Sequence, residues 1–272
     1  MSESLLRTDL PPITIKLKRF HDVHPIFIVG SVRSGTSAMM HALRSGAKIR
    51  GFNEGAVAHM MPELLERVSK HYGSFASKPT TMLGSVESRY FINGIRNLFG
   101  QAYYEIMGSG RWLDKTPGGA EMVRTCPILL RMFPHSRFVF CKRRGIENVL
   151  SRQRKFPQIE FEKHCQPWAG TMETWLRVRE KLGEHAVEVD QRSMAVDPDG
   201  VARMLAAFLP LSAEEAEGFR AVLAGSRLEQ TRPIDDELPV ALSATGWSPH
   251  EMHVFERICG PMMETYEYRM KE

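Results

Sequence analysis

A short glycine-containing stretch, GSVRSGTS, combines the residue types that hold a phosphate group. Its glycines, Gly30 and Gly35, have the spacing of the loop that wraps phosphates with backbone N–H groups at the start of a helix. Ser37 keeps the final hydroxyl of that loop, whereas Thr36 stands where a nucleotide-hydrolysing loop has its lysine. Arg33 places a positive charge inside the loop instead. The pattern predicts a phosphate site without the lysine that bridges β and γ phosphates.

A second concentration of positive charge follows the apolar run FVFC. Arg143 lies at the end of that run, and Ser151 follows it about two turns along the helix expected next. Because ligands gather at the carboxyl ends of parallel strands, we expect both side chains to converge on one phosphate. A basic cluster of this kind is otherwise a solvated surface patch. Two separated phosphate sites together predict a nucleotide such as 3′-phosphoadenosine-5′-phosphosulfate (PAPS).

An alternation of buried strands and helices would position these two sites. The runs PIFIVG and SRFVFC are short, continuous and apolar, which is typical of parallel strands buried on both faces. The pattern predicts an α/β protein with a P-loop-type three-layer fold, in which helices flank a central, mostly parallel sheet. We expect one domain over residues 1–272, with an N-terminal extension over 1–24. Expected strands cover 25–30, 112–117, 136–141 and 186–189, and residues 48–53 fit a second short strand or a strand-to-loop step. Expected helices cover 36–45, 57–70, 91–106, 145–155, 167–185 and 249–266, with a further helix from 198.

The composition excludes several classes of protein. Of the 272 residues, 43% are hydrophobic and 25% are charged, as in ordinary globular proteins. No run approaches the ~18 apolar residues of a membrane helix, and MSESLLRTDLPPITIKLKRF lacks the apolar centre of a signal peptide. The four cysteines have no metal-binding spacing, which indicates reduced thiols and a cytoplasmic location. The compact basic patch fits a few phosphates better than a nucleic acid.

Two motifs resemble those of the PAPS-dependent sulfotransferases. IFIVGSVRSGTS is similar to the loop of that family that binds the 5′-phosphosulfate, with Val32 where proline is common. FVFCKRRGIENVLS is similar to the segment that binds the 3′-phosphate, and it keeps the arginine and the serine as Arg143 and Ser151. The intervening residues depart from the family pattern. The similarity extends over residues 25–268 and implies the same fold and the same donor.

Within the family, the motifs are most similar to those of tyrosylprotein sulfotransferases and their bacterial relatives. A glutamate in that branch follows the loop arginine at a fixed distance and acts as the base, and Glu54 stands at that distance from Arg33. LDKTP resembles the lysine-containing turn of the branch and nominates Lys115. The cofactor-binding lysine that follows A-L-S in the branch has no counterpart here, because Ala244 occupies its position.

The resemblance implies a direct, in-line transfer with a general base. Glu54 would take the proton of an acceptor hydroxyl as its oxygen attacks sulfur in line, help that is worth about 10²–10⁴-fold. Arg33 and Lys115 would stabilise the charge that develops as adenosine 3′,5′-bisphosphate (PAP) leaves. An ion pair between Lys115 and Asp114 at a strand end is the plainer alternative. The residues expected to bind the donor are Arg33, Ser34, Gly35, Thr36, Ser37, Arg143 and Ser151.

No metal is expected to be required. A nucleotide-hydrolysing loop needs a strand-end aspartate to hold magnesium, and the run AVEVD is only a weak candidate for one. An ATP-dependent P-loop kinase is one alternative function, and it predicts magnesium dependence. A non-catalytic nucleotide-binding protein of the same fold is the other.

The acceptor stays open at this point, because a peptide tyrosine, a glycan, a lipid and a small molecule all offer the same hydroxyl nucleophile. The oligomeric state is open as well.

Overall fold

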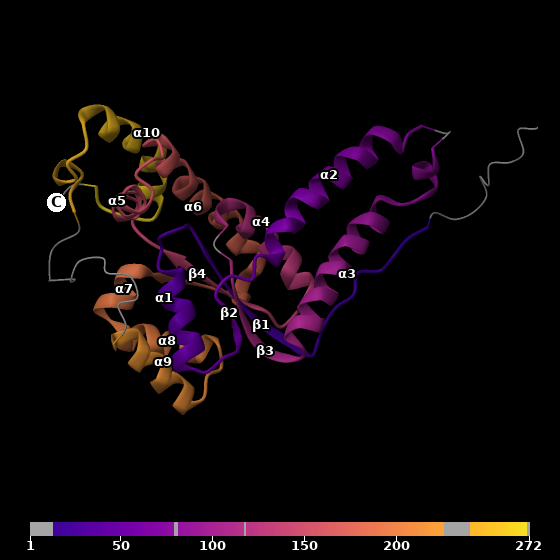
Figure 1. Ribbon diagram of the computed structural model, residues 1–272, viewed down its shortest axis with the longest axis horizontal. Coiled ribbons are helices and arrows are strands. Elements are labelled where there is room, and N and C mark those ends of the chain that lie inside the picture. Colours follow the sequence, from indigo (N-terminus) through magenta and orange to yellow (C-terminus); the bar gives the residue numbers. More distant parts are fainter. Residues whose placement is uncertain (1–12, 79–80, 117, 226–239, 271–272) are drawn as a thin grey trace, which may run out of the picture.

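A five-stranded sheet forms the centre of the computed structural model, with the strand order β2-β3-β1-β4-β5. Each neighbouring pair of strands runs parallel. Helices cover both faces of the sheet (Figure 1), which confirms the predicted three-layer α/β fold. The strands are β1 (Val23–Gly30), β2 (Gly51–Phe52), β3 (Gly110–Lys115), β4 (Arg137–Lys142) and β5 (Ala186–Asp190).

The structure describes residues 13–78, 81–116, 118–225 and 240–270. The first part of the predicted N-terminal extension, residues 1–12, and Pro117 at the end of a predicted strand lie outside the described residues. Within the described ranges, no helix combines the length and the apolar character needed to cross a membrane.

Alternating side chains of the strands build a separate core on each face of the sheet. On β1, Phe27 and Val29 point into one core, whereas Ile26 and Ile28 point into the other. Successive side chains of a strand face opposite sides, so a continuous apolar run is what a strand between two helical layers requires. The runs PIFIVG and SRFVFC therefore lie at the centre of the molecule, as predicted.

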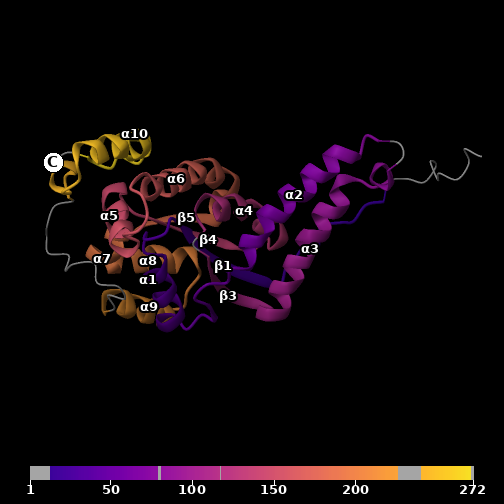
Figure 2. The same ribbon diagram turned by 45° about the horizontal axis from the view of Figure 1, so that its top comes forward.

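The larger core lies under a layer of long helices. Two of them, α2 and α3, extend together away from the sheet as a helical hairpin, which both views show (Figures 1 and 2). The helices of this layer are α2 (Met60–Phe75), α3 (Ser88–Met107), α4 (Gly119–Met132), α5 (Gly145–Lys155), α6 (Glu162–Leu182) and α10 (Pro249–Thr265). On the opposite face lie α1 (Thr36–His41), α7 (Gln191–Val196), α8 (Pro198–Phe208) and α9 (Ala213–Gly225).

Several element boundaries differ from the prediction. The helix expected to begin at Pro167 begins five residues earlier in α6, because His164 and Cys165 are buried and anchor an additional turn. Residues 48–53, expected as a short strand or a strand-to-loop step, contain only the two-residue strand β2. Three helices, α4, α7 and α9, were not predicted at all. The first of these contains Pro127, which obscures its helical pattern.

The end of the first helix has a packing requirement of its own. After α1, the chain continues through a π-helical turn, Ala42–Gly46, which packs against α9. A Cβ atom on Gly46 would overlap the carbonyl oxygen of Gly218, and a Cβ atom on Gly218 would overlap that of Gly46. The two backbones therefore touch at a pair of glycines.

Gly218→Ala should lower the free energy of unfolding by about 1–3 kcal/mol, because the added methyl group has no space between the two backbones. Gly170→Ala is the matched control in α6, where a Cβ atom would meet nothing within 4 Å. It should raise the free energy of unfolding by about 0.4–1 kcal/mol. Urea denaturation of both variants measures the difference. Equal effects would show that the backbones do not meet there.

Candidate functional site

The loop between β1 and α1 turns close to the neighbouring strand β4. A Cβ atom on Gly30 would overlap the carbonyl oxygen of Cys141 in β4, so this position accepts only glycine. Gly35 has φ 86° directly before α1, and Arg33 has φ 76°. Positive φ values turn the chain sharply and are readily adopted by glycine. The loop glycines thus fit a tight turn from strand to helix, which is the context that a phosphate-binding loop needs.

Asn148 on α5 binds this loop through its side-chain amide. Its Nδ2 donates to Ser31 Oγ, Val32 O and Ser34 Oγ, each at 3.1 Å. Ser34 is fully buried, and its hydroxyl lies 2.6 Å from that of Ser31. The side chain of Ser34 therefore holds the loop together from inside. Asn148 was not predicted, although its place one turn before Ser151 on the same helix was a usable signal.

Arg33 joins the loop to the second predicted anion site. Its Nε donates to Ser151 Oγ at 3.0 Å, and Arg143 Nη1 donates to the carbonyl oxygen of Arg33 at 3.2 Å. Trp168 Nε1 donates to the carbonyl oxygen of Arg143 at 2.9 Å and fixes this strand end from α6. The structure thus brings the predicted residues Arg33, Arg143 and Ser151 together in one cluster.

Arg143 is a largely buried cation among charges of both signs. Burial, the largest cause, lowers the pKa of its guanidinium to about 10; Arg154 and Arg33 act in the same direction, whereas Glu147 and Asp190 act in the opposite one. Its Nε is buried and has no hydrogen-bond partner among the described residues. A buried donor without a partner costs about 1–3 kcal/mol. An anion at this point would supply both an acceptor and a counter-charge.

A second group of predicted residues meets at the end of β3. Lys115 Nζ lies 3.1 Å from Glu54 Oε1 and 3.5 Å from Ser37 Oγ at the end of the loop that follows β1. Lys115 is only 4% exposed, whereas the Glu54 side chain is 67% exposed. The buried ammonium therefore links a carboxylate that faces solvent to the loop. The alternative pairing of Lys115 with Asp114 is wrong, because successive residues of a strand face opposite sides.

Asp114 instead fixes the segment that carries Glu54. The hydroxyl of Tyr103 donates to Asp114 Oδ2, and Thr116 Oγ1 donates to Asp114 Oδ1 at 2.8 Å. The backbone N–H of Gly55 donates to the same carboxylate. Burial raises the pKa of Asp114, although these hydrogen bonds act in the opposite direction. An aspartate inside an apolar strand was the sequence signal for this connection.

Asp190, the candidate strand-end aspartate, has other partners. Its Oδ1 accepts the N–H of Arg192 and caps α7, and its Oδ2 accepts the hydroxyl of Tyr268 at 2.6 Å. Both carboxylate oxygens are thus engaged in holding the start of a helix and the C-terminal segment.

A model of the sulfotransferase family matches residues 25–215, a segment that contains the loop, Glu54, Lys115, Arg143 and Ser151. The chain belongs to the sulfotransferase family. No curated protein matches it in sequence. The match covers most of the chain and includes every residue for which a role in the site was predicted.

Solved structures of other sulfotransferases have the same fold as this sulfotransferase. The sulfotransferase domain of the Synechococcus PCC 7002 olefin synthase superposes with a TM-score of 0.57 at 15% identity, over 94% of this chain and 99% of that domain. Sulfotransferase STF9 from Mycobacterium avium gives 0.53 at 16% identity, over 92% and 78%. The sulfotransferase domain from the curacin biosynthetic pathway gives 0.52 at 18% identity, over 93% and 100%.

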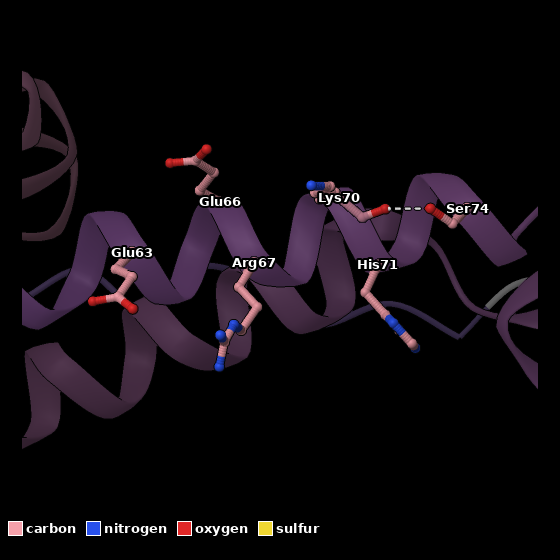
Figure 3. Close-up of a pocket in the computed structure, with 6 residues that line it drawn as sticks. All are labelled: Glu63, Glu66, Arg67, Lys70, His71 and Ser74. Atoms are coloured by element: carbon pink, nitrogen blue, oxygen red, sulfur yellow. Dashed lines mark hydrogen bonds between the residues drawn. The ribbon is translucent and has the colours of Figure 1, made fainter.

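A cavity of about 480 Å³ lies along α2 (Figure 3), and none of the predicted site residues lines it. Its lining side chains all come from this one helix at helical spacing, with two glutamates followed by basic and polar residues towards the end of the helix. Such spacing allows attraction between charges one turn apart on a solvated helix. No second element contributes a converging group, so we do not count it as part of the site. The lining residues are Glu63, Glu66, Arg67, Lys70, His71 and Ser74.

The clamp by Asn148 can be tested through nucleotide binding. Asn148→Ala removes the donor that holds Ser31 and Ser34, so the loop should lose its order before a ligand arrives. The lost hydrogen bonds, about 1–3 kcal/mol, should weaken PAP binding about tenfold, measured by calorimetric titration. Asn97→Ala is the control, because Asn97 accepts the backbone N–H of Lys18 far from the loop. If both variants bind PAP like the wild type, the clamp has no role in binding.

Proposed function

We propose that the protein transfers the sulfuryl group of PAPS to an acceptor hydroxyl, with Glu54 as the general base. The observation that carries this proposal is the path from Glu54 through Lys115 to Ser37, which links a solvent-facing carboxylate to the phosphate loop. The family match supports a sulfotransferase, and the cluster around Arg143 supports a donor that has a second phosphate.

The donor would span the two groups of residues. The N–H groups of Gly35, Thr36 and Ser37 open the helix after the loop and lack partners within it, so they suit a 5′-phosphate. Arg143 and Ser151 would hold the 3′-phosphate, where the unpartnered Nε of Arg143 needs an acceptor. Arg33 belongs to the loop and donates to Ser151 in this structure, and we assign its guanidinium to the sulfonate end of the donor, as the resemblance to the family implies.

In the reaction, Glu54 accepts the proton of the acceptor hydroxyl while the oxygen forms its bond to sulfur. The bond between sulfur and the bridging phosphate oxygen breaks, and PAP carries away the electron pair. Lys115 and Arg33 stabilise the negative charge that builds on this oxygen and on the sulfonate. Because Lys115 is buried and already next to Ser37, its position needs little reorganisation during the reaction.

The exposed side of Glu54 is where the acceptor would enter. A peptide tyrosine, a glycan, a lipid and a small molecule are all compatible with this open approach, and the similarity to tyrosylprotein sulfotransferases favours none of them decisively. No metal takes part in the proposed reaction, since Arg33, Arg143 and Lys115 supply the positive charge. The cysteines, all buried and free, fit the cytoplasmic location predicted from the sequence.

Glu54→Gln tests the proposed base. The amide keeps an acceptor for Lys115 but cannot take a proton, so transfer of radiolabelled sulfonate from PAPS should fall by about 10²–10⁴-fold. PAP binding should stay within a factor of about two, because Glu54 does not contact the nucleotide in this mechanism. Glu66→Gln, on the exposed face of α2, is the control and should transfer normally. Full activity of Glu54→Gln would contradict the assignment of the base.

The 3′-phosphate site is tested by Arg143→Ala. Removing the guanidinium should weaken PAP binding about 10–100-fold, the value of one charge-assisted interaction of about 1.5–3 kcal/mol. Adenosine 5′-monophosphate, which lacks the 3′-phosphate, should bind the variant and the wild type with similar affinity. Arg177→Ala on the exposed side of α6 serves as the control. An equal loss for both nucleotides would show that Arg143 does not read the 3′-phosphate.

A further inference from the structure

Four arginines line a cavity between the first half of α3, the last turn of α4 and the segment before β1. The cavity has a volume of about 570 Å³, within the range of small-molecule sites, and no acidic residue lines it among those described. Arg89 and Arg96 come from α3, Arg131 comes from the last turn of α4, and Arg19 comes from the segment before β1. Since α4 starts after the carboxyl end of β3 and β1 starts after Arg19, the cavity lies at the amino end of the strands.

The elements that carry these arginines are fixed to one another. Asn93 Nδ2 donates to the carbonyl oxygen of Ile15 at 2.8 Å, and Asn97 Oδ1 accepts the N–H of Lys18 at 2.7 Å. These two contacts hold the N-terminal segment along α3. The N–H of Phe20 donates to Met132 O at 2.8 Å and joins the same segment to the end of α4. The arginines are therefore held near one another by backbone contacts that owe nothing to their charges.

None of the four has a compensating carboxylate in the described part of the chain. The ion pairs there join carboxylates to other arginines and lysines. Arg96 is the most buried of the four, and its Nε has neither solvent nor a described hydrogen-bond partner. Burial lowers the pKa of Arg96, and the charge of Arg131 lowers it further. Guanidinium groups that converge without a counter-charge repel one another; Arg19, Arg89 and Arg131 are exposed to solvent, whereas Arg96 is half-buried.

We propose that Arg19, Arg89, Arg96 and Arg131 form a second oxyanion site, which binds a phosphate- or sulfate-bearing ligand. The planar fork of arginine matches the oxygen atoms of a tetrahedral oxyanion, and Asn93 at the cavity wall, held by Ile15, accepts from Arg96 Nη1 at 3.5 Å and helps to orient that guanidinium. The ligand would supply the missing acceptor to Arg96 Nε and join the N-terminal segment, α3 and α4. The site is separate from the phosphate loop, and it does not depend on the function proposed above.

Calorimetric titration of the full chain with inorganic pyrophosphate tests this site. We expect saturable binding that persists when PAP is present in excess, because PAP would occupy the loops at the carboxyl ends of the strands. Arg96→Gln and Arg131→Gln should each weaken pyrophosphate binding at least tenfold, whereas Arg203→Gln, an exposed arginine on α8, should leave it unchanged. Absence of pyrophosphate binding, or equal affinity in all three variants, would overturn the proposal.

Thermal denaturation separates loss of the site from loss of the fold. Without an anion, Arg96→Gln and Arg131→Gln should melt at or above the temperature of the wild type, because each removes part of the repulsion. Pyrophosphate should raise the melting temperature of the wild type and of Arg203→Gln, but not that of the other two. A rise of the same size in Arg131→Gln, whose side chain is exposed and not needed for packing, would contradict the proposal.

The source of the anion is distinguished by a sedimentation experiment with vesicles that contain phosphatidic acid. Sedimentation of the wild type, but not of Arg96→Gln, would identify a lipid headgroup as the ligand. Binding of pyrophosphate without sedimentation would identify a soluble ligand. If neither probe binds in an Arg96-dependent manner, the site does not exist.

Discussion

The contact between Arg33 and α5 is the constraint on which the site depends. Through its Nε and its carbonyl oxygen, Arg33 binds both Ser151 and Arg143, so the loop after β1 and the segment after β4 form one surface. The two strands are neighbours in the sheet, which brings together residues more than a hundred positions apart in the sequence. Asn148 adds the hydrogen bonds that hold the loop backbone. The proposed nucleotide can be bound at both phosphates only if these two segments stay at a fixed separation.

The end of β3 provides the second fixed point, and the alternation of strand side chains explains it. Asp114 faces one side and holds the segment next to Glu54 through the N–H of Gly55, whereas Lys115 faces the other and reaches Glu54 and Ser37. A buried ammonium needs a counter-charge, so Glu54 is drawn towards the loop although most of its side chain is in solvent. The same strand thus fixes the backbone next to the candidate base and places a positive charge beside its carboxylate.

Local sequence patterns predicted the strands and the loop that are specified by residues close together in the sequence. Apolar runs identified β1 and β4, and the glycine spacing identified the loop between β1 and α1. Helix α9 has few buried side chains, and its place depends on the contact between Gly46 and Gly218, which no local pattern reveals. The roles of Asn148 and Asp114 were missed for the same reason, because their partners come from distant segments. The catalytic role of Lys115 stays a prediction, and its observed ion-pair partner is Glu54, not the neighbouring Asp114.

A crystal structure of the protein with PAP tests the central claim most directly. The 5′-phosphate should lie at the N–H groups of Gly35 to Ser37, and the 3′-phosphate should lie within hydrogen-bonding distance of Arg143 and Ser151. Arg143 Nε should then have an acceptor, and Glu54 should stay beside Lys115 with space for an acceptor hydroxyl. A nucleotide whose 3′-phosphate lies away from Arg143 and Ser151 would contradict it.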